Sequence, residues 1–254
     1  QEHSWQNNVQ RIYDVISDQG FYLELLNHPD KEWTQEELLE YVYNKLAAFE
    51  AGKDNGYSNT NFTLVSMVVE EATGKDHAAL LREKIIQPLD LHNTYYYYHD
   101  DLPEYTAQGY FDLYNNGDIM NMTNYNTGSG NGYGGIYSTV HDLKIFAEAL
   151  LKEKTLLDSA SLETMLTWTK ENKEEHRRFG LGIFKDFLER PEGQYGWGHR
   201  GRDLAYSSDL FYFPNINTTM AYLVNYGTNG ESSLKPVFFE FRDQVADALF
   251  NRDL

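Results

Sequence analysis

The loop at residues 52–62 reads Gly-Lys-Asp-Asn-Gly-Tyr-Ser-Asn-Thr-Asn-Phe and runs directly into a helical pattern. Apolar side chains recur at helical spacing from Asn61 to Thr73, and Gly74 follows as a residue suited to the left-handed conformation at a helix end. The stretch therefore predicts a polar loop that leads into a helix. Tyr57 and Asn59 lie two positions apart, so they point the same way if the loop is extended.

Further helices are predicted on both sides of this stretch. Thr34–Glu37 form a capping box that begins a helix from about 35 to 47. Residues 78–86 keep helical periodicity up to a proline, which cannot extend a helix. A second capping box at Thr139–Asp142 leads into another apolar helical pattern. Residues 10–175 thus read as helices joined by long loops.

The pattern changes to period two after Arg178, which is typical of antiparallel strands joined by short turns. The chain then closes with an apolar helical stripe over 232–249, in which Ser232 or Ser233 is the expected N-cap and Pro236 lies in the first turn. We therefore divide the chain into a mainly helical lobe at 12–175 and a lobe of strands plus a helix at 176–254. The predicted strands are 179–184, 195–199, 204–213 and 218–226.

Composition excludes several classes of function. The net charge of -18 repels phosphate backbones and anionic lipids, so nucleic acid is not an expected partner. The chain has no cysteine, and none of its eight histidines shows a metal-binding spacing. The seven histidines other than His199 are expected at the surface or as capping residues. No apolar run is long enough for a membrane span and no secretion signal is seen, so we expect a mature, truncated or cytoplasmic chain.

Three further segments accompany the tyrosine loop in a fixed order. They are Ile86–Thr94, then Gly134–Leu143 with the pattern Gly-Gly-x-x-Ser-Thr-x-x-Asp-Leu, and then Gly198–Gly201, reading Gly-His-Arg-Gly. Together with the Tyr-x-Asn loop they resemble the serine β-lactamase and penicillin-binding protein superfamily, of the class C β-lactamase and D-alanyl-D-alanine carboxypeptidase kind. Each motif alone is weak, whereas four in the family's order are specific.

The resemblance covers residues 12 to about 235 and implies both a fold and an activity. The fold is α/β, with an antiparallel sheet flanked by helices, a mainly helical lobe and a cleft between the lobes. The activity is that of a serine hydrolase: acyl transfer to water, through an acyl-enzyme, from a β-lactam, a D-Ala-D-Ala-type peptide or a small ester. No cofactor is expected, and the family favours an extracytoplasmic location.

The resemblance also assigns roles to three polar side chains. Tyr57 is expected to act as the general base that takes the proton of the serine nucleophile, provided that cationic neighbours lower the pKa of its phenol. Asn59 is expected to position the substrate, since an amide both donates and accepts hydrogen bonds. His199 takes the place of the lysine found on this strand in many relatives and offers a polar edge near the substrate.

Two arginines flank the glycine of the last motif. The backbone N–H of Arg202, which follows Gly201, falls where the resemblance places half of the oxyanion hole, and the glycine leaves room for a ligand. Arg200, with Arg202, is a candidate for binding a substrate carboxylate. The alternative for both arginines is an ordinary surface strand.

The family's nucleophile motif, Ser-x-x-Lys, is not found upstream of Tyr57, where it is expected. The one literal match, Ser232–Lys235, follows the other motifs, and we interpret it as a capped helix start. The part of the fold that is not matched would hold two strands and the nucleophile helix, so an exposed apolar gap is expected. Three explanations stay open: a fragment of a longer enzyme, a nucleophile from an N-terminal segment or second chain, and a non-catalytic relative.

A binding module for carbohydrates is the rival interpretation. Tyr95–Tyr98 with Trp33, Trp168 and Trp197 could form stacking platforms in a chain with 15% aromatic residues.

Gly128–Gly132 superficially suggests a phosphate loop, but no strand precedes it and no Gly-Lys-Ser/Thr follows, so a flexible loop near the cleft is expected instead.

Overall fold

The computed structural model describes residues 18–47, 49–50, 53–171, 178–228 and 234–251. Contacts divide the chain into two compact units. The first unit comprises Gln1–Glu104 and Asn124–Tyr137, and the second comprises Tyr105–Thr123 and Ser138–Leu254. None of the described helices is long and apolar enough to cross a lipid bilayer.

The first unit is mainly helical, and polar side chains cap its helices where the sequence predicts. The capping box of Thr34 and Glu37 is present, Asp76 caps the next short helix, and Gly74 ends the long helix with φ at 65°. The predicted helix from 35 to 47 ends early, because turns follow and Asn44 takes a φ of 61°. The elements are α2 (Gln19–Asn27), α3 (Gln35–Glu40), α4 (Asn59–Thr73), α5 (His77–Leu81), η2 (Arg82–Ile86), β1 (Tyr95–Tyr96) and its antiparallel partner β4 (Ile136–Tyr137).

Helix α4 buries its small polar side chains rather than its apolar ones. The glycine-rich loop lies against it so closely that a Cβ on Gly132 would stand 2.4 Å from Ser66 Oγ. The buried residues of α4 are accordingly Asn59, Thr60, Thr63 and Ser66. Its branched apolar residues are left exposed: Leu64 at 45%, Val65 at 56% and Val68 at 67%. We call these three residues the α4 apolar face; an exposed apolar surface of this kind is what the sequence predicts.

The second unit is built on a five-stranded antiparallel sheet in the order β5-β6-β7-β8-β9. The stretch predicted as one strand at 179–184 is two short strands joined by a turn that contains Gly182, whose φ is 70°. The elements are β2 (Tyr110–Phe111), β3 (Met120–Asn121), α6 (Val140–Ala147), η3 (Glu148–Lys152), α7 (Ser159–Met165), β5 (Arg178–Phe179), β6 (Phe184–Lys185), η4 (Glu192–Gln194), β7 (Trp197–Arg202), β8 (Ser207–Phe213), η5 (Pro214–Ile216), β9 (Thr218–Val224) and α8 (Lys235–Phe250).

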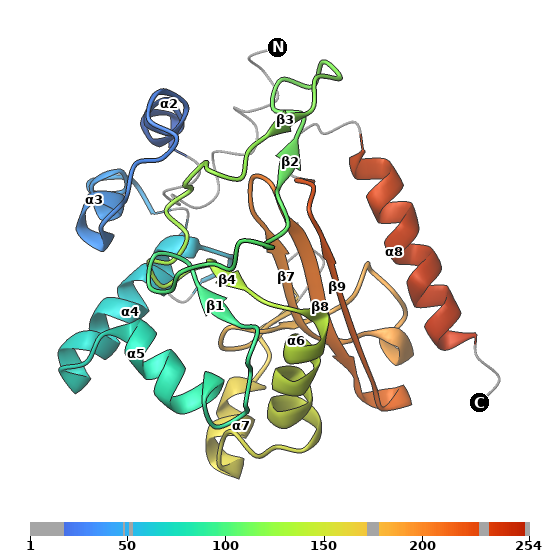
Figure 1. Cartoon of the computed structure of the whole chain (residues 1–254). Coiled ribbons are helices and arrows are strands. Elements are labelled where there is room, and N and C mark those ends of the chain that lie inside the picture. Colours follow the sequence, from blue (N-terminus) through green and yellow to red (C-terminus); the bar gives the residue numbers. More distant parts are fainter. Residues whose placement is uncertain (1–17, 48, 51–52, 172–177, 229–233, 252–254) are drawn as a thin grey trace. The chain divides into compact units, whose positions relative to one another are not determined.

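Helices cover both faces of this sheet, because β8 alternates its side chains between them. Phe211 and Phe213 are fully buried in one cluster with Ala246 of α8, whereas Tyr212 packs with Leu151 of η3 on the other face. Full burial of one phenylalanine contributes about 1.5–3 kcal/mol to folding. Packing on both faces therefore confirms the predicted α/β architecture, and α8 runs alongside β9 (Figure 1).

The boundary between the two lobes and the start of the last helix were both predicted from the sequence. Residues 138–175 were assigned to the helical lobe by the sequence pattern, whereas contacts group them with the sheet because α6 packs on β8 and β9. The predicted N-caps Ser232 and Ser233 lie outside the described residues, and Pro236 does stand in the first turn of α8.

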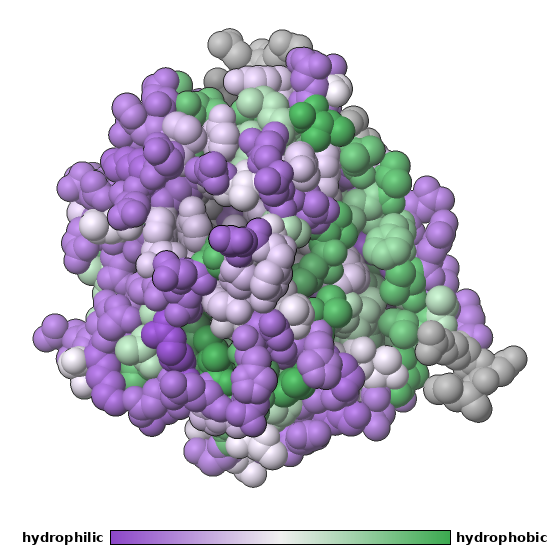
Figure 2. Space-filling view, viewed as in Figure 1, coloured by the Kyte–Doolittle hydropathy of each residue, from purple (hydrophilic) through white to green (hydrophobic). Residues whose placement is uncertain are grey.

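The open edge of the sheet is apolar. Among the described strands, β9 pairs only with β8, and its Leu223 is 43% exposed. Val237 and Phe241 of α8 are also exposed, at 60% and 45%. Figure 2 shows apolar side chains gathered along β9 and the neighbouring side of α8. An apolar strand edge of this kind is a surface that other strands readily join.

Candidate active site

The structure brings Tyr57 and Asn59 together at the start of α4. The Tyr57 hydroxyl donates to Asn59 Oδ1 at 2.8 Å. Asn59 does not lie in an extended loop, as the sequence suggested, but is the first residue of α4, because the helix begins immediately after the extended Ser58. The side chains meet nonetheless, with Asn59 8% exposed and Tyr57 half-buried. A tyrosine hydroxyl beside a buried amide is a suitable pair for moving a proton and orienting an amide substrate.

The glycine-rich loop is buried and hydrogen-bonded, which corrects the prediction of a flexible loop. Asn131 Nδ2 donates to the carbonyls of Trp33 and Gly128, both at 3.0 Å. From Gly128 to Gly135 the chain takes positive φ at five glycines, where other side chains would be strained. The loop therefore braces the helix that carries Asn59.

Two histidines predicted at the surface or at caps also brace this loop. His99 Nε2 donates to the Gly130 carbonyl at 3.0 Å, and His77 Nε2 lies 3.2 Å from the same oxygen. His77 Nδ1 lies 2.5 Å from a Glu70 carboxylate oxygen. The hydrogen bonds and charge of His77 outweigh burial and hold the pKa of Glu70 below its usual value.

One group of potential metal ligands exists among the described residues. Ligand atoms of Glu70, Asp76 and His77 all lie within 4.8 Å of one another. Each carboxylate is already engaged at the start of α5: Asp76 accepts from Ala79 N at 3.0 Å, and Glu70 accepts from His77 N at 3.1 Å. Helix capping accounts for the cluster, so we assign no metal to it.

The third motif lies on β7, at the part of that strand that extends beyond β6. In the described sheet β6 pairs with β7 only at Trp197 and Gly198, so His199–Arg202 have a neighbouring strand on the β8 side alone. A Cβ on Gly201 would stand 2.2 Å from Ser208 Oγ, so the serine hydroxyl would have to turn away. This segment thus presents backbone along an open strand edge, where an extended ligand can align.

His199 stacks on Phe184 with ring centroids 4.3 Å apart, and its Nδ1 lies 2.7 Å from the Arg200 carbonyl. A carbonyl only accepts, so Nδ1 carries the proton in this arrangement and Nε2 is the acceptor when the ring is neutral. His199 therefore offers a hydrogen-bonding edge even when it is uncharged.

The side chains of Arg200 and Arg202 lie on the α8 face of the sheet, because residues alternate along a strand. The Arg200 guanidinium pairs with Asp186 at 3.5 Å and lies over the Phe211 ring. Arg202 donates to Asp209 at 2.8 Å. A carboxylate-binding role for either arginine stays a prediction, to which these contacts add no support.

The predicted site is thus divided between the units. Tyr57 and Asn59 belong to the first unit, and His199–Arg202 belong to the second. The sequence interpretation missed Asp209 of β8 and Arg242 of α8, whose side chains meet at 2.6 Å between the sheet and the helix. A signal was present, since each is a charged residue within an otherwise apolar pattern, but their pairing is not local.

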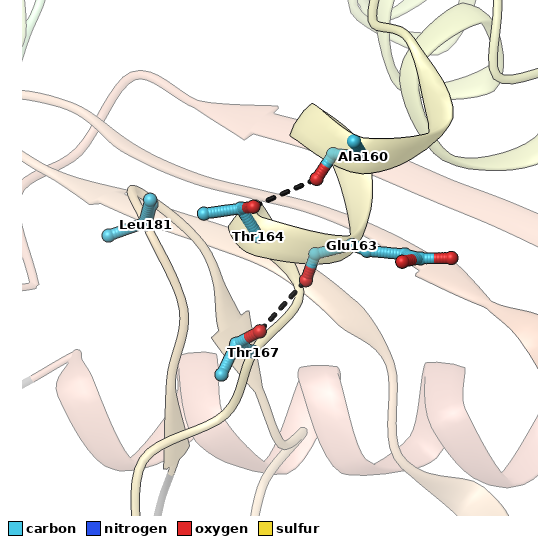
Figure 3. Close-up of a pocket in the computed structure, with 5 residues that line it drawn as sticks. All are labelled: Ala160, Glu163, Thr164, Thr167 and Leu181. Atoms are coloured by element: carbon cyan, nitrogen blue, oxygen red, sulfur yellow. Dashed lines mark hydrogen bonds between the residues drawn. The ribbon is translucent and has the colours of Figure 1, made fainter.

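An open hollow in the second unit lies apart from these motifs. It is formed by α7 and by Leu181 on the turn between β5 and β6 (Figure 3). The hydroxyls of Thr164 and Thr167 donate to the helix's own carbonyls, at 2.8 and 2.9 Å. The lining therefore offers little polar chemistry to a ligand, and none of the motif residues lines it.

Comparisons with known proteins agree with these motifs. The family model described as beta-lactamase matches residues 17–236. The structure of a D-stereospecific amidohydrolase from Streptomyces sp. is 29% identical with a TM-score of 0.75, over 87% of this chain and 66% of that one. A penicillin-binding protein from Bacillus halodurans is 20% identical with a TM-score of 0.75, over 97% and 73% of the two chains, and shows the same fold.

Penicillin-binding protein 4* of Bacillus subtilis is 27% identical over 187 residues, which is 70% of this chain and 41% of that protein. The chain spans less than half the length of the curated relatives it matches. It also spans 66% of the Streptomyces structure. Both figures indicate that the relatives contain a substantial part that this chain does not match.

Proposed function

Because the chain belongs to the beta-lactamase family, we propose that it is the larger part of a serine hydrolase that transfers an acyl group to water. Tyr57 is the general base, Asn59 orients the substrate amide, and the N–H of Arg202 is one oxyanion donor. The observation that carries the proposal is the 2.8 Å hydrogen bond between Tyr57 and Asn59 within the family-matched segment. Its substrate is a small carbonyl compound: a β-lactam, a D-Ala-D-Ala-type peptide or a small ester.

The relatives support an amide bond as the scissile group. The Streptomyces neighbour, which is 29% identical to this chain, is a D-stereospecific amidohydrolase. Tyr57 is suited to this chemistry, since a phenolate that accepts the serine proton becomes a phenol, which can then protonate a leaving amine. One scaffold supports several such reactions, so the proposal extends to the class of substrate and not to a single compound.

The proposal requires a serine nucleophile from outside the matched motifs. The α4 apolar face supports this requirement, since it lies on the helix that Asn59 begins and exposes three branched side chains. Exposed apolar patches mark sites where another segment packs. We propose that a segment bearing Ser-x-x-Lys, from an N-terminal extension or a second chain, covers this face and completes the site.

The 254-residue chain alone is expected to form no acyl adduct with a fluorescent penicillin, because it has no nucleophile in a matched context. Intact-mass measurement after prolonged incubation checks this. We call the chain the completed enzyme once an upstream segment that carries Ser-x-x-Lys is joined to it or added in trans. An adduct only in this form supports the proposal.

Two other outcomes would count against the proposal. A stoichiometric adduct on the chain alone, mapped to Ser232, would show that the N-cap interpretation is wrong and that the motifs are permuted. Failure of the folded completed enzyme to acylate would favour a non-catalytic relative that binds similar ligands.

Lysine at both Val65 and Val68 is expected to abolish acylation by the completed enzyme while leaving the thermal midpoint of the 254-residue chain almost unchanged. The two side chains are 56% and 67% exposed, so the chain itself tolerates charge there, whereas a docked apolar segment does not. Leu181→Lys is the matched control, since Leu181 is 64% exposed and lies in the second unit. Normal acylation by the double lysine variant would exclude this face as the docking surface.

A further inference from the structure

Asp209 is a buried charge on which three other elements of the second unit converge. It is fully buried on β8 and accepts from Arg202 Nη2 of β7 at 2.8 Å. Arg242 Nε of α8 lies 2.6 Å from its other oxygen, and the hydroxyl of Tyr222 on β9 donates to that oxygen as well. A buried carboxylate requires such partners to remain ionised.

Arg242 and Tyr222 contact Asp209 independently of Arg202. Arg242 is 1% exposed and packs against the rings of Phe238 and Phe239, at 5.7 and 5.4 Å. Burial and the Asp209 carboxylate raise the pKa of Tyr222 well above its ordinary value, so its hydroxyl stays a donor. Arg242 Nη2 has no hydrogen-bond partner in the part of the chain that the structure describes.

Arg202 also makes contacts that play no part in attaching α8 to the sheet. Its Nη1 donates to its neighbour's carbonyl, Gly201 O, at 2.5 Å and also to Ser208 O on the adjacent strand. One guanidinium therefore ties together the backbone of two strands while its other nitrogen is anchored on a buried carboxylate. The planar, multidentate fork of arginine suits this task in a way that lysine does not.

The segment held in this way is the one that most needs support. Residues His199–Arg202 extend beyond β6, and the strand ends at Arg202. Strand ends with a neighbour on one side open more readily than central strands. Gly201 adds no side chain that could pack and stiffen the backbone. The Arg202 guanidinium restrains this segment of β7, as a second neighbouring strand does elsewhere in the sheet.

We propose that the Arg202 side chain is a positioning group, which the buried Asp209 anchors so that the backbone at Gly201 and Arg202 is held rigid for oxyanion binding. This inference rests on the proposed function, in which the Arg202 N–H is an oxyanion donor. The side chain acts from the α8 face of the sheet, whereas the N–H acts at the strand edge.

Amide hydrogen exchange of the full 254-residue chain tests the proposal, with Arg202→Met and Arg202→Lys as variants. Arg202→Met is expected to speed exchange at positions 201 and 202 by about tenfold or more, and Arg202→Lys by less. Amides of β9 and α8 should stay protected, because Asp209 keeps Arg242 and Tyr222. Arg190→Met is the matched control, since Arg190 pairs with Asp243 and Asp247 of α8.

Unchanged exchange at positions 201 and 202 in Arg202→Met would overturn the proposal. Equal acceleration throughout β7, β9 and α8 would also overturn it, because that result identifies a general stabilising role. In the completed enzyme, Arg202→Met is expected to lower kcat about tenfold or more with little change in KM, since loss of an oxyanion donor costs even more. Local loosening with unaltered kcat would overturn the positioning role, whereas the assignment of the Arg202 N–H as an oxyanion donor would stand, because the variant retains that backbone group.

Discussion

Tyr57→Phe is expected to lower turnover by the completed enzyme by about 10² or more, which is the usual contribution of a general acid or base. The substitution removes only the hydroxyl that donates to Asn59, so the half-buried ring keeps its packing. Steady-state hydrolysis of a reporter ester or β-lactam measures the effect. The thermal midpoint should change little, because a single exposed or half-buried hydrogen bond contributes about 1 kcal/mol.

Tyr195→Phe is the control for this experiment. The Tyr195 hydroxyl donates to Glu192 at 3.2 Å on the surface of the second unit, so its loss should leave turnover unaltered. Unchanged turnover in Tyr57→Phe would show that another group takes the serine proton. A comparable loss in both variants would instead point to a general effect of removing tyrosine hydroxyls.

Asp209→Ala is expected to destabilise the chain by about 3–5 kcal/mol, because it leaves buried cations without their counter-charge. Arg242 is 1% exposed and Arg202 is largely buried, so neither guanidinium reaches water easily when the carboxylate is removed. Denaturant unfolding followed by tryptophan fluorescence measures the loss as a lower midpoint.

Asp243→Ala provides the comparison. Asp243 pairs with Arg190 at 3.0 Å but is 62% exposed, and exposed ion pairs contribute about 0–1 kcal/mol. A loss in Asp209→Ala no larger than in Asp243→Ala would show that water or a rearranged partner compensates the buried arginines.

Features that depend on a few neighbouring residues were predicted well from the sequence. The capping box at Thr34 and the terminator Gly74 satisfy backbone groups within one turn, and the proline in the first turn of α8 has no N–H to leave unpaired there, so local spacing carries the information. The Tyr-x-Asn pair is of the same kind. Even there the structure corrected a detail, because α4 begins at Asn59 and not after the loop.

Element lengths were predicted less well, since packing overrides local pattern. The apolar spacing beyond Glu40 is helical, yet the chain turns there and Leu46 is 84% exposed. The strand predicted at 179–184 is a hairpin whose turn brings Phe179 opposite Phe184. A turn longer or shorter by two residues changes which residues pair across the two strands, whereas the alternation of apolar residues in the sequence stays almost the same.

By itself, the sequence determined the family, the α/β class and the residues of the motifs, because these depend on residue types at fixed spacing. The tertiary structure alone decided which face of α4 is exposed and which groups meet Asp209. Both depend on residues far apart in the chain: the glycine-rich loop reaches α4 from beyond position 127, and Arg202, Tyr222 and Arg242 reach Asp209 from three elements. Contacts of this kind follow from how close-packed elements fit together in space, which no local pattern records.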